Sequence, residues 1–172
     1  MSPRGGSLNQ IEFLLKKHRG GNILLDTNVL LLYVVGRHDR DLISRFKRTN
    51  NFVPEDFDSI ETLISNFSTI STTPSILTEV SNYCGDLESK HREGCLDSLR
   101  DLVLTAKERR YESKLVCQDP GFIRFELTDT TILRASRNGD LVLTTDLPLH
   151  AELLRHSRPT INFNNLRPLG WS

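Results

Sequence analysis

The run of residues 23–35 constrains the fold most, because it is almost entirely apolar and Asp26 is its only charged residue. Residues 22–25 form a short apolar stretch that is typical of a buried strand, and residues 27–35 are expected to continue as an apolar helix. The run is well short of the roughly 20 residues that a membrane-spanning helix needs. A buried strand that passes directly into an apolar helix predicts the first βα unit of an α/β domain.

The rest of the chain repeats this alternation of strands and helices. Further strands are expected over residues 69–72, 141–145 and 159–163. Helices are expected over residues 8–18, 37–48, 59–67, 74–83, 87–111, 128–137 and 147–156, and a loop over 50–58. The pattern predicts an α/β domain with a mainly parallel sheet.

Composition narrows the class of protein. A length of 172 residues suits one domain. Lys plus Arg and Asp plus Glu both number 22. This balance argues against a protein that binds nucleic acid tightly and without sequence specificity, because such proteins carry an excess of positive charge. The three cysteines contain no C-x-x-C pair, so we expect free thiols rather than a disulfide framework or a zinc site. No secretory signal follows the N-terminus, and we expect a cytoplasmic protein without a membrane anchor.

Two carboxylates follow directly after predicted strands. Asp26 comes after residues 22–25, and Asp146 comes after residues 141–145. Each alone is equally well explained as the N-cap of the next helix. Two strands that both end in Asp are more informative, because adjacent parallel strands end at the edge of the sheet where α/β proteins bind ligands.

Two further acids lie within predicted helices, on sides that also carry apolar residues. Glu79 shares a partly apolar stripe with Ile76 and Val80, and Asp129 has Ile132 one turn after it. Taken singly, Glu79 is better explained as an acid that reaches water, and Asp129 as an acid placed favourably at a helix start. If all four carboxylates converge, they repel one another unless a cation binds.

Such a cluster of oxygen ligands suits hard divalent ions such as Mg²⁺ or Mn²⁺. Two ions about 4 Å apart can activate water and stabilise the leaving oxygen in phosphodiester cleavage. No Ser or His nucleophile is needed, and we find no credible triad.

Four motifs resemble those of PIN domains and occur in the order of that family. They are ILLDTNVLLL, PSILTEVSNY, LTDTTILRAS and LVLTTDLPLHAELL. The resemblance covers residues 22–165 as one domain, preceded by a flexible leader and an N-terminal helix over 1–21 and followed by a tail over 166–172. It implies a central, mainly parallel sheet of four or five strands flanked by helices.

The resemblance also implies a metal-dependent endoribonuclease with an acidic two-metal site for Mg²⁺ or Mn²⁺. The metal-binding and catalytic acids it implies are Asp26, Glu79, Asp129 and Asp146. Asn28 and Thr145 match positions that help to orient those acids, although hydrogen bonding at the start of a helix explains them equally well.

A basic segment offers a place for RNA. Residues 37–48 follow the helix that leaves Asp26, and we expect Arg37, Arg40 and Arg45 to contact substrate phosphates. An ordinary solvated helix face explains these arginines equally well. Reversing the charge of Arg40 and Arg45 should weaken RNA binding and flatten its salt dependence if they make such contacts.

Several alternatives stay open at this point. The chain resembles toxins of toxin–antitoxin pairs, which would imply an antitoxin-like protein partner, and PIN domains often form homodimers. A catalytically silent PIN-fold scaffold that binds RNA or protein is the main rival, although such members usually lack one or more acids. A haloacid-dehalogenase-type phosphatase is disfavoured, because Asn28 stands where that class has a second Asp.

Overall fold

The protein has a five-stranded sheet between helices in the computed structural model, which describes residues 3–167. The strand order is β3-β2-β1-β4-β5, and every neighbouring pair is parallel. The strands are β1 (Asn22–Leu25), β2 (Thr69–Thr72), β3 (Lys107–Glu108), β4 (Leu141–Thr144) and β5 (Thr160–Asn162). The predicted fold class, an α/β fold with a parallel sheet flanked by helices, is confirmed.

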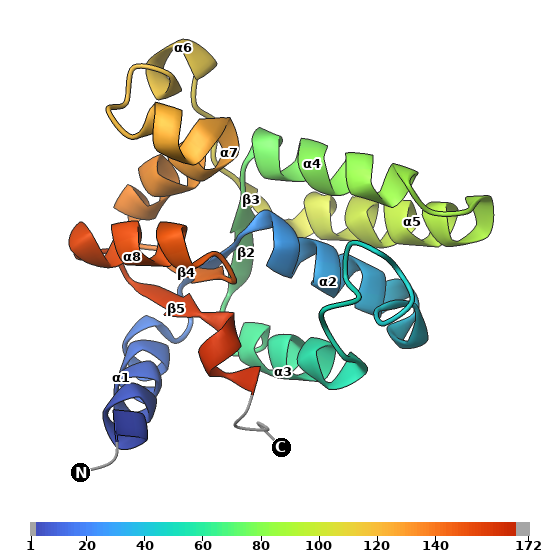
Figure 1. The fold of residues 1–172 in the computed structure, drawn as a ribbon, viewed down its shortest axis with the longest axis horizontal. Coiled ribbons are helices and arrows are strands. Elements are labelled where there is room, and N and C mark those ends of the chain that lie inside the picture. The colour runs from blue at the N-terminus through green and yellow to red at the C-terminus, as the bar shows by residue number, and fades with distance from the viewer. Residues whose placement is uncertain (1–2, 168–172) are drawn as a thin grey trace.

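Helices connect the strands in chain order. The α-helices are α1 (Pro3–His18), α2 (Thr27–His38), α3 (Pro54–Ile64), α4 (Pro74–Gly85), α5 (Ser89–Thr105), α6 (Ser113–Val116), α7 (Phe122–Ala135) and α8 (Leu147–Arg155). Short 3-10 turns occupy η1 (Arg40–Leu42), η2 (Ser136–Asn138) and η3 (Phe163–Asn165). In Figure 1, α2 to α5 lie to the right of the sheet, whereas α1 and α8 lie to its left.

This arrangement makes a topological switch between the two central strands. β1 is followed by α2 on one side of the sheet, and β4 is followed by α8 on the other (Figure 1). The register pairs Leu25 with Leu143, and the backbone N–H of Asp26 donates to the Leu143 carbonyl at 3.0 Å. The ends of β1 and β4 therefore flank the crevice in which doubly wound α/β proteins bind ligands.

Helix α2 is buried along most of its length, as its apolar sequence predicts. Its positions from Val29 to Gly36 are all buried, and it packs against α3, α4 and α5. A Cβ atom on Gly36 would lie 2.3 Å from the ring of Phe57, so this crossing of α2 with α3 requires glycine. The packing fixes the direction of α2 and hence the position of Asp26 at its start.

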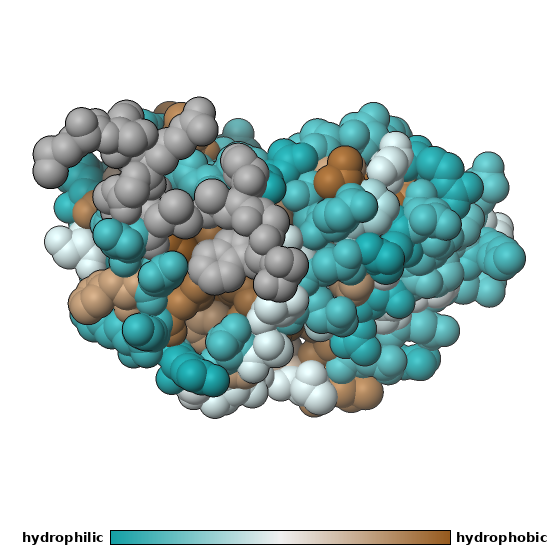
Figure 2. Space-filling view, turned by 90° about the horizontal axis from the view of Figure 1, so that it is seen from below, coloured by the Kyte–Doolittle hydropathy of each residue, from teal (hydrophilic) through white to brown (hydrophobic). Residues whose placement is uncertain are grey.

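The surface seen from below is largely hydrophilic, with apolar residues visible mainly in the left half of Figure 2. Within residues 3–167, no helix is both long enough and apolar enough to span a bilayer. Cys84 and Cys95 are buried and Cys117 is exposed, and all three are free thiols, as we expected.

The predicted helix over residues 37–48 is wrong. Helix α2 ends at His38, and residues 40–50 form η1 and a series of turns. The carboxylate of Asp39 accepts from the backbone N–H of Asp41, and the hydroxyl of Thr49 donates to the Ile43 carbonyl. Side-chain bonds of this kind compete with helical ones.

The loop expected over residues 50–58 is partly helix, because α3 begins at Pro54. Proline suits the first helical position. The carboxylate of Asp56 accepts from the backbone N–H of Val53 and caps this end of the helix.

The long helix expected over residues 87–111 ends at Thr105, and β3 follows it. This strand has two residues at the edge of the sheet, and its polar sequence carries no apolar alternation. The helix expected over 128–137 is instead the second half of α7. Helix α7 is broken at Glu126, and Thr128 lies after the break rather than capping a new helix.

The two ends of the chain also differ from expectation. Helix α1 begins at Pro3 rather than residue 8, so the backbone of residues 3–6 is helical instead of a flexible leader. In the expected tail, Leu166 is buried in the core and Arg167 forms an ion pair with Asp56. Residues 1–2 and 168–172 lie outside the described part of the chain.

Candidate acidic site

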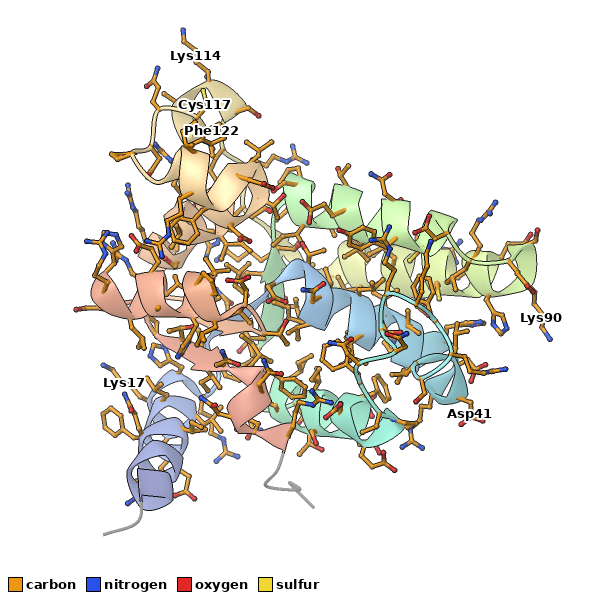
Figure 3. All side chains as sticks on the ribbon, in the orientation of Figure 1. Lys17, Asp41, Lys90, Lys114, Cys117 and Phe122 are labelled. Atoms are coloured by element: carbon orange, nitrogen blue, oxygen red, sulfur yellow. The ribbon has the colours of Figure 1, made fainter. Side chains whose placement is uncertain are left out.

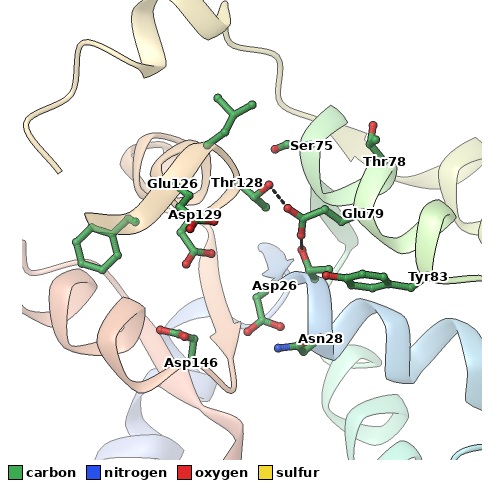
Figure 4. Close-up of a pocket in the computed structure, with 13 residues that line it drawn as sticks. Asp26, Asn28, Ser75, Thr78, Glu79, Tyr83, Glu126, Thr128, Asp129 and Asp146 are labelled. Atoms are coloured by element: carbon green, nitrogen blue, oxygen red, sulfur yellow. Dashed lines mark hydrogen bonds between the residues drawn. The ribbon is translucent and has the colours of Figure 1, made fainter. Parts of the chain in front are cut away.

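The four acids identified in the sequence line one cavity of about 600 Å³ at the carboxyl ends of β1 and β4. Figure 4 shows their side chains around a common open space, with Asp26 and Asp146 from the sheet edge, Glu79 from α4 and Asp129 from α7. The other residues that line the cavity are Thr27, Asn28, Ser75, Thr78, Tyr83, Phe125, Glu126, Leu127 and Thr128.

Asp26 is the most firmly held of the four. One carboxylate oxygen accepts from the backbone N–H of Val29 at 2.7 Å, which caps α2. The other accepts from the hydroxyl of Thr144 and from the backbone N–H of Thr145 at 2.8 Å. Burial raises the pKa of Asp26, and these three hydrogen bonds oppose that rise while the charge of Asp146 adds to it.

Asp146 is oriented in a similar way at the end of the neighbouring strand. Its carboxylate accepts from the backbone N–H of Leu149 at 2.6 Å and caps α8. Its own backbone N–H donates to the hydroxyl of Thr144 at 2.9 Å. Because the same hydroxyl donates to Asp26, Thr144 ties the two strand-end acids to each other.

Glu79 reaches the cavity from the second turn of α4 and is held by two threonines. One carboxylate oxygen accepts from the hydroxyl of Thr27 at 2.7 Å and the other from the hydroxyl of Thr128 (Figure 4). These bonds connect the starts of α2 and of the second half of α7 to α4. Glu79 therefore fixes the distance between the elements that carry Asp26 and Asp129.

Asp129 stands apart, because no hydrogen bond to its carboxylate is found among residues 3–167. Burial and, to a lesser extent, the charges of Asp146, Asp26, Glu79 and Glu126 together raise its pKa to about 7. An acid that is partly buried among four others is costly to ionise. A bound cation would remove this cost.

Glu126 is a fifth acid of the cavity that the sequence did not reveal. Its backbone has φ 57° and ψ −171°, a conformation that is normally confined to glycine. The surrounding run of helix-forming residues gives no signal of this break. The break turns the second half of α7, and with it Thr128 and Asp129, toward α4 and the sheet edge.

Glu126→Gly is expected to raise the free energy of unfolding by roughly 1–2 kcal/mol, because it relieves backbone strain at some cost in chain entropy. Urea denaturation at pH 8 would measure the change. Glu126→Ala removes the same charge but keeps the Cβ atom, so its gain should be smaller. A loss of stability on introducing glycine would show that residue 126 has ordinary helical geometry.

The two residues expected to support the acids take different roles. Thr145 contacts Asp26 through its backbone N–H, and the neighbouring Thr144 supplies the hydroxyl. Asn28 lines the cavity and is exposed, without a hydrogen bond to any of the four acids among the described residues. Asp26 is therefore held by both threonines at the end of β4 and not by Thr145 alone.

The three arginines expected to contact RNA do not line the acidic cavity. Arg37 lies near the C-terminal end of α2, about 16 Å along the helix from Asp26 at 1.5 Å per residue. Arg40 pairs with Asp58, and the guanidinium of Arg45 lies 3.6 Å from Asp39. Contact between these arginines and RNA stays a prediction about a separate surface.

The chemistry of the donor set fits a hard divalent cation, although the carboxylates are not drawn tightly together. Within residues 3–167, no three Asp, Glu, His or Cys side chains form a ready-made metal cluster. All four acids nevertheless line the same cavity, and Asp129 has no competing hydrogen bond there. Metal binding would require the carboxylates to move closer together, and the side chain of Asp129 can move without losing a hydrogen bond to the described residues.

Comparison with known proteins adds a similarity to a solved structure. No family model matches the chain, and no curated protein matches it. The chain is similar to a domain of a functionally unknown protein from Methanocaldococcus jannaschii DSM 2661, with 14% sequence identity and a TM-score of 0.44. The match covers 82% of this chain and 89% of that one.

Proposed function

We propose that the protein is a divalent-metal-dependent endoribonuclease of the PIN type. The observation that carries this proposal is the meeting of Asp26 and Asp146 at the ends of adjacent parallel strands, with Glu79 and Asp129 facing the same cavity. The four acids come from the ends of two parallel strands, from α4 and from the part of α7 that follows its break. A purely structural role explains the two helix caps but leaves the carboxylate of Asp129 without a partner among residues 3–167.

Each acid has a distinct part in this proposal. Asp26 and Asp146 are held by backbone N–H groups and form the rigid side of the metal site. Glu79 positions the opposite side through its two threonine bonds. Asp129 is the adjustable ligand. Bound Mg²⁺ or Mn²⁺ would supply Lewis-acid activation of water and neutralise charge on the scissile phosphate.

The lining of the cavity favours phosphate chemistry that depends on bound metal. The cavity is open and polar, and no arginine or lysine lines it among the described residues. Phosphate esterases that act without metal need cationic side chains around the phosphate. In this site the positive charge has to come from bound cations.

Incubation with single-stranded and structured RNA in Mg²⁺, Mn²⁺ or EDTA tests the proposal. We expect cleavage in either metal and none in EDTA. Failure of the folded protein to cut any RNA, together with absent metal binding in a calorimetric titration, would contradict the nuclease and favour the scaffold. Hydrolysis of a small aryl phosphate, with RNA left intact, would point instead to a phosphatase.

The partners follow as part of the same proposal. An antitoxin-like protein that enters the acidic cavity with an arginine or lysine would compete with the metal for these carboxylates. Adding such a partner should abolish cleavage and raise the Mg²⁺ concentration needed to restore it. Size measurement in solution would decide between a monomer and the homodimer implied by the resemblance.

A further inference from the structure

A second cavity lies directly beside the acidic one. It has a volume of about 420 Å³ and lies between α7, α8 and the turn before β5. Phe125 lines both cavities, and its side chain is buried. A chain of nucleotides that leaves the acidic cavity over Phe125 would therefore enter this second space.

Arginines dominate the lining of the second cavity, which we call the arginine cleft. They come from α7, η2, α8 and the turn before β5, and they are Arg124, Arg137, Arg155 and Arg158. The described lining also contains two carboxylates, so two positive charges remain in excess. Figure 3 shows nitrogen-tipped side chains gathered at the left, around α7 and α8.

The two carboxylates of the cleft neutralise it only in part. Glu152 is held by Arg155 and lies 3.1 Å from the Nε2 atom of His156. The carboxylate of Asp119 is 3.9 Å from the guanidinium of Arg137, which is too long for a hydrogen bond. Guanidinium groups gathered in a concave space repel one another unless an anion is bound.

Arg124 and Arg158 have no ion pair within residues 3–167. The guanidinium of Arg124 lies 4.8 Å from the centre of the Phe125 ring. This contact holds Arg124 at the boundary between the arginine cleft and the acidic cavity. Both guanidinium groups keep their hydrogen-bond donors available for two oxygens of one phosphate.

We propose that the arginine cleft binds a phosphate of the RNA strand whose neighbouring phosphodiester lies in the acidic cavity. The inference rests on the proposed nuclease function and adds the path that the RNA strand takes across the protein. It also accounts for the neutral overall charge, because the positive charge needed to hold RNA is concentrated in one cleft instead of being spread over the surface. The turns after α2 are less suited, because Arg40 and Arg45 there already face carboxylates.

Binding of a labelled 12-nucleotide single strand in EDTA, measured by fluorescence anisotropy, tests the cleft without any cleavage. Arg124→Gln combined with Arg158→Gln should raise Kd about tenfold or more. The slope of log K against log salt should become shallower by about 0.7, because one phosphate of the single strand is no longer neutralised. The matched control combines Arg100→Gln and Arg110→Gln, which are exposed and lie outside both cavities, and it should leave Kd unchanged.

Glu152→Gln provides a test in the opposite direction. It removes a negative charge from the cleft and frees Arg155, so RNA should bind several-fold more tightly. Loss of the native cleft would lower the affinity, so a gain with an unchanged thermal melt reports on the charge of the cleft. Thermal melts would confirm that the double arginine variant folds. A variant with Lys at both positions should recover part of the affinity that the Gln variant loses.

The outcomes separate this inference from the nuclease proposal. If the double variant binds RNA more weakly and the wild-type protein cuts no RNA, the cleft proposal stands and the nuclease proposal is rejected. An unchanged Kd and salt slope for the double variant would overturn the cleft. A loss of affinity confined to Arg40→Gln with Arg45→Gln would overturn it as well. The remaining outcome is that the double variant loses binding of inorganic pyrophosphate while its RNA affinity stays unchanged. That result would show that the cleft binds a small phosphate compound and not an RNA strand.

Discussion

Replacing Asp26 with Asn should reduce metal-dependent RNA cleavage by about a thousandfold or more, because the central carboxylate of the site loses its charge. Asp26 sits between the ends of β1 and β4 and faces Asp146 across the switch point. Asn remains a good helix cap, so α2 should still begin at the same residue. The NH₂ group of Asn cannot accept hydrogen bonds, so the bonds to one of the two carboxylate oxygens of Asp26 are lost. We expect a loss of roughly 1–3 kcal/mol in the free energy of unfolding.

Asp56→Asn is the matched control for this loss of stability. Asp56 is as buried as Asp26, at 4% exposure, and it caps α3 outside the acidic cavity. It should lose stability through its bond to Arg167 but keep the cleavage rate. Rates measured under single-turnover conditions would compare the two. Equal loss of activity in both variants would show that Asp26 acts only through stability.

Replacing Asp129 with Asn should make the metal-free protein more stable while it abolishes cleavage. The pKa of Asp129 is raised from an ordinary 3.8 to about 7 in the folded state. The unfolded chain therefore gives up this proton first as pH rises, and ionisation disfavours the folded state increasingly between about pH 4 and pH 7. Above pH 7 the full cost, roughly 2–4 kcal/mol, is present in the wild type and absent from the variant.

Thermal melts in EDTA at pH 5 and pH 8 would measure this difference. The melting temperature of the variant should exceed that of the wild type by more at pH 8 than at pH 5. The reason is that the cost of ionising Asp129 in the folded wild type is larger at the higher pH. Adding Mn²⁺ at pH 8 should raise the melting temperature of the wild type and have much less effect on the variant. Asp101→Asn, an exposed carboxylate of α5, controls for the amide change. A variant less stable than the wild type at pH 8 would contradict this account.

Much of the fold could be predicted because its strands are short, apolar and directly followed by helices. β1 and β4 are almost completely buried, and their sequences show it. β3 could not be predicted, because a two-residue edge strand needs no apolar side chains. The turns after α2 were missed because bonds from Asp39 and Thr49 outweigh the helical tendency of the charged run.

The candidate site also contains residues that the sequence predicts and residues that it does not. Asp26 and Asp146 could be located from their positions after strands, since parallel neighbours must end at the same edge. Glu79 and Asp129 required the motif resemblance, because an acid within a helix says little alone. Glu126 and the arginine cleft depend on a break in α7 and on contacts between distant elements, which residue spacing does not encode.

The most direct test of the acidic site is to locate Mn²⁺ by anomalous scattering in crystals of the wild-type protein. The account predicts Mn²⁺ in the cavity, with carboxylate oxygens of Asp26, Asp129 and Asp146 at about 2.1 Å, a normal distance for a small hard divalent ion. Glu79 would lie beside the ion or bind a second one. An empty cavity at a Mn²⁺ concentration that supports cleavage, or Mn²⁺ bound only elsewhere, would contradict the assignment of these acids.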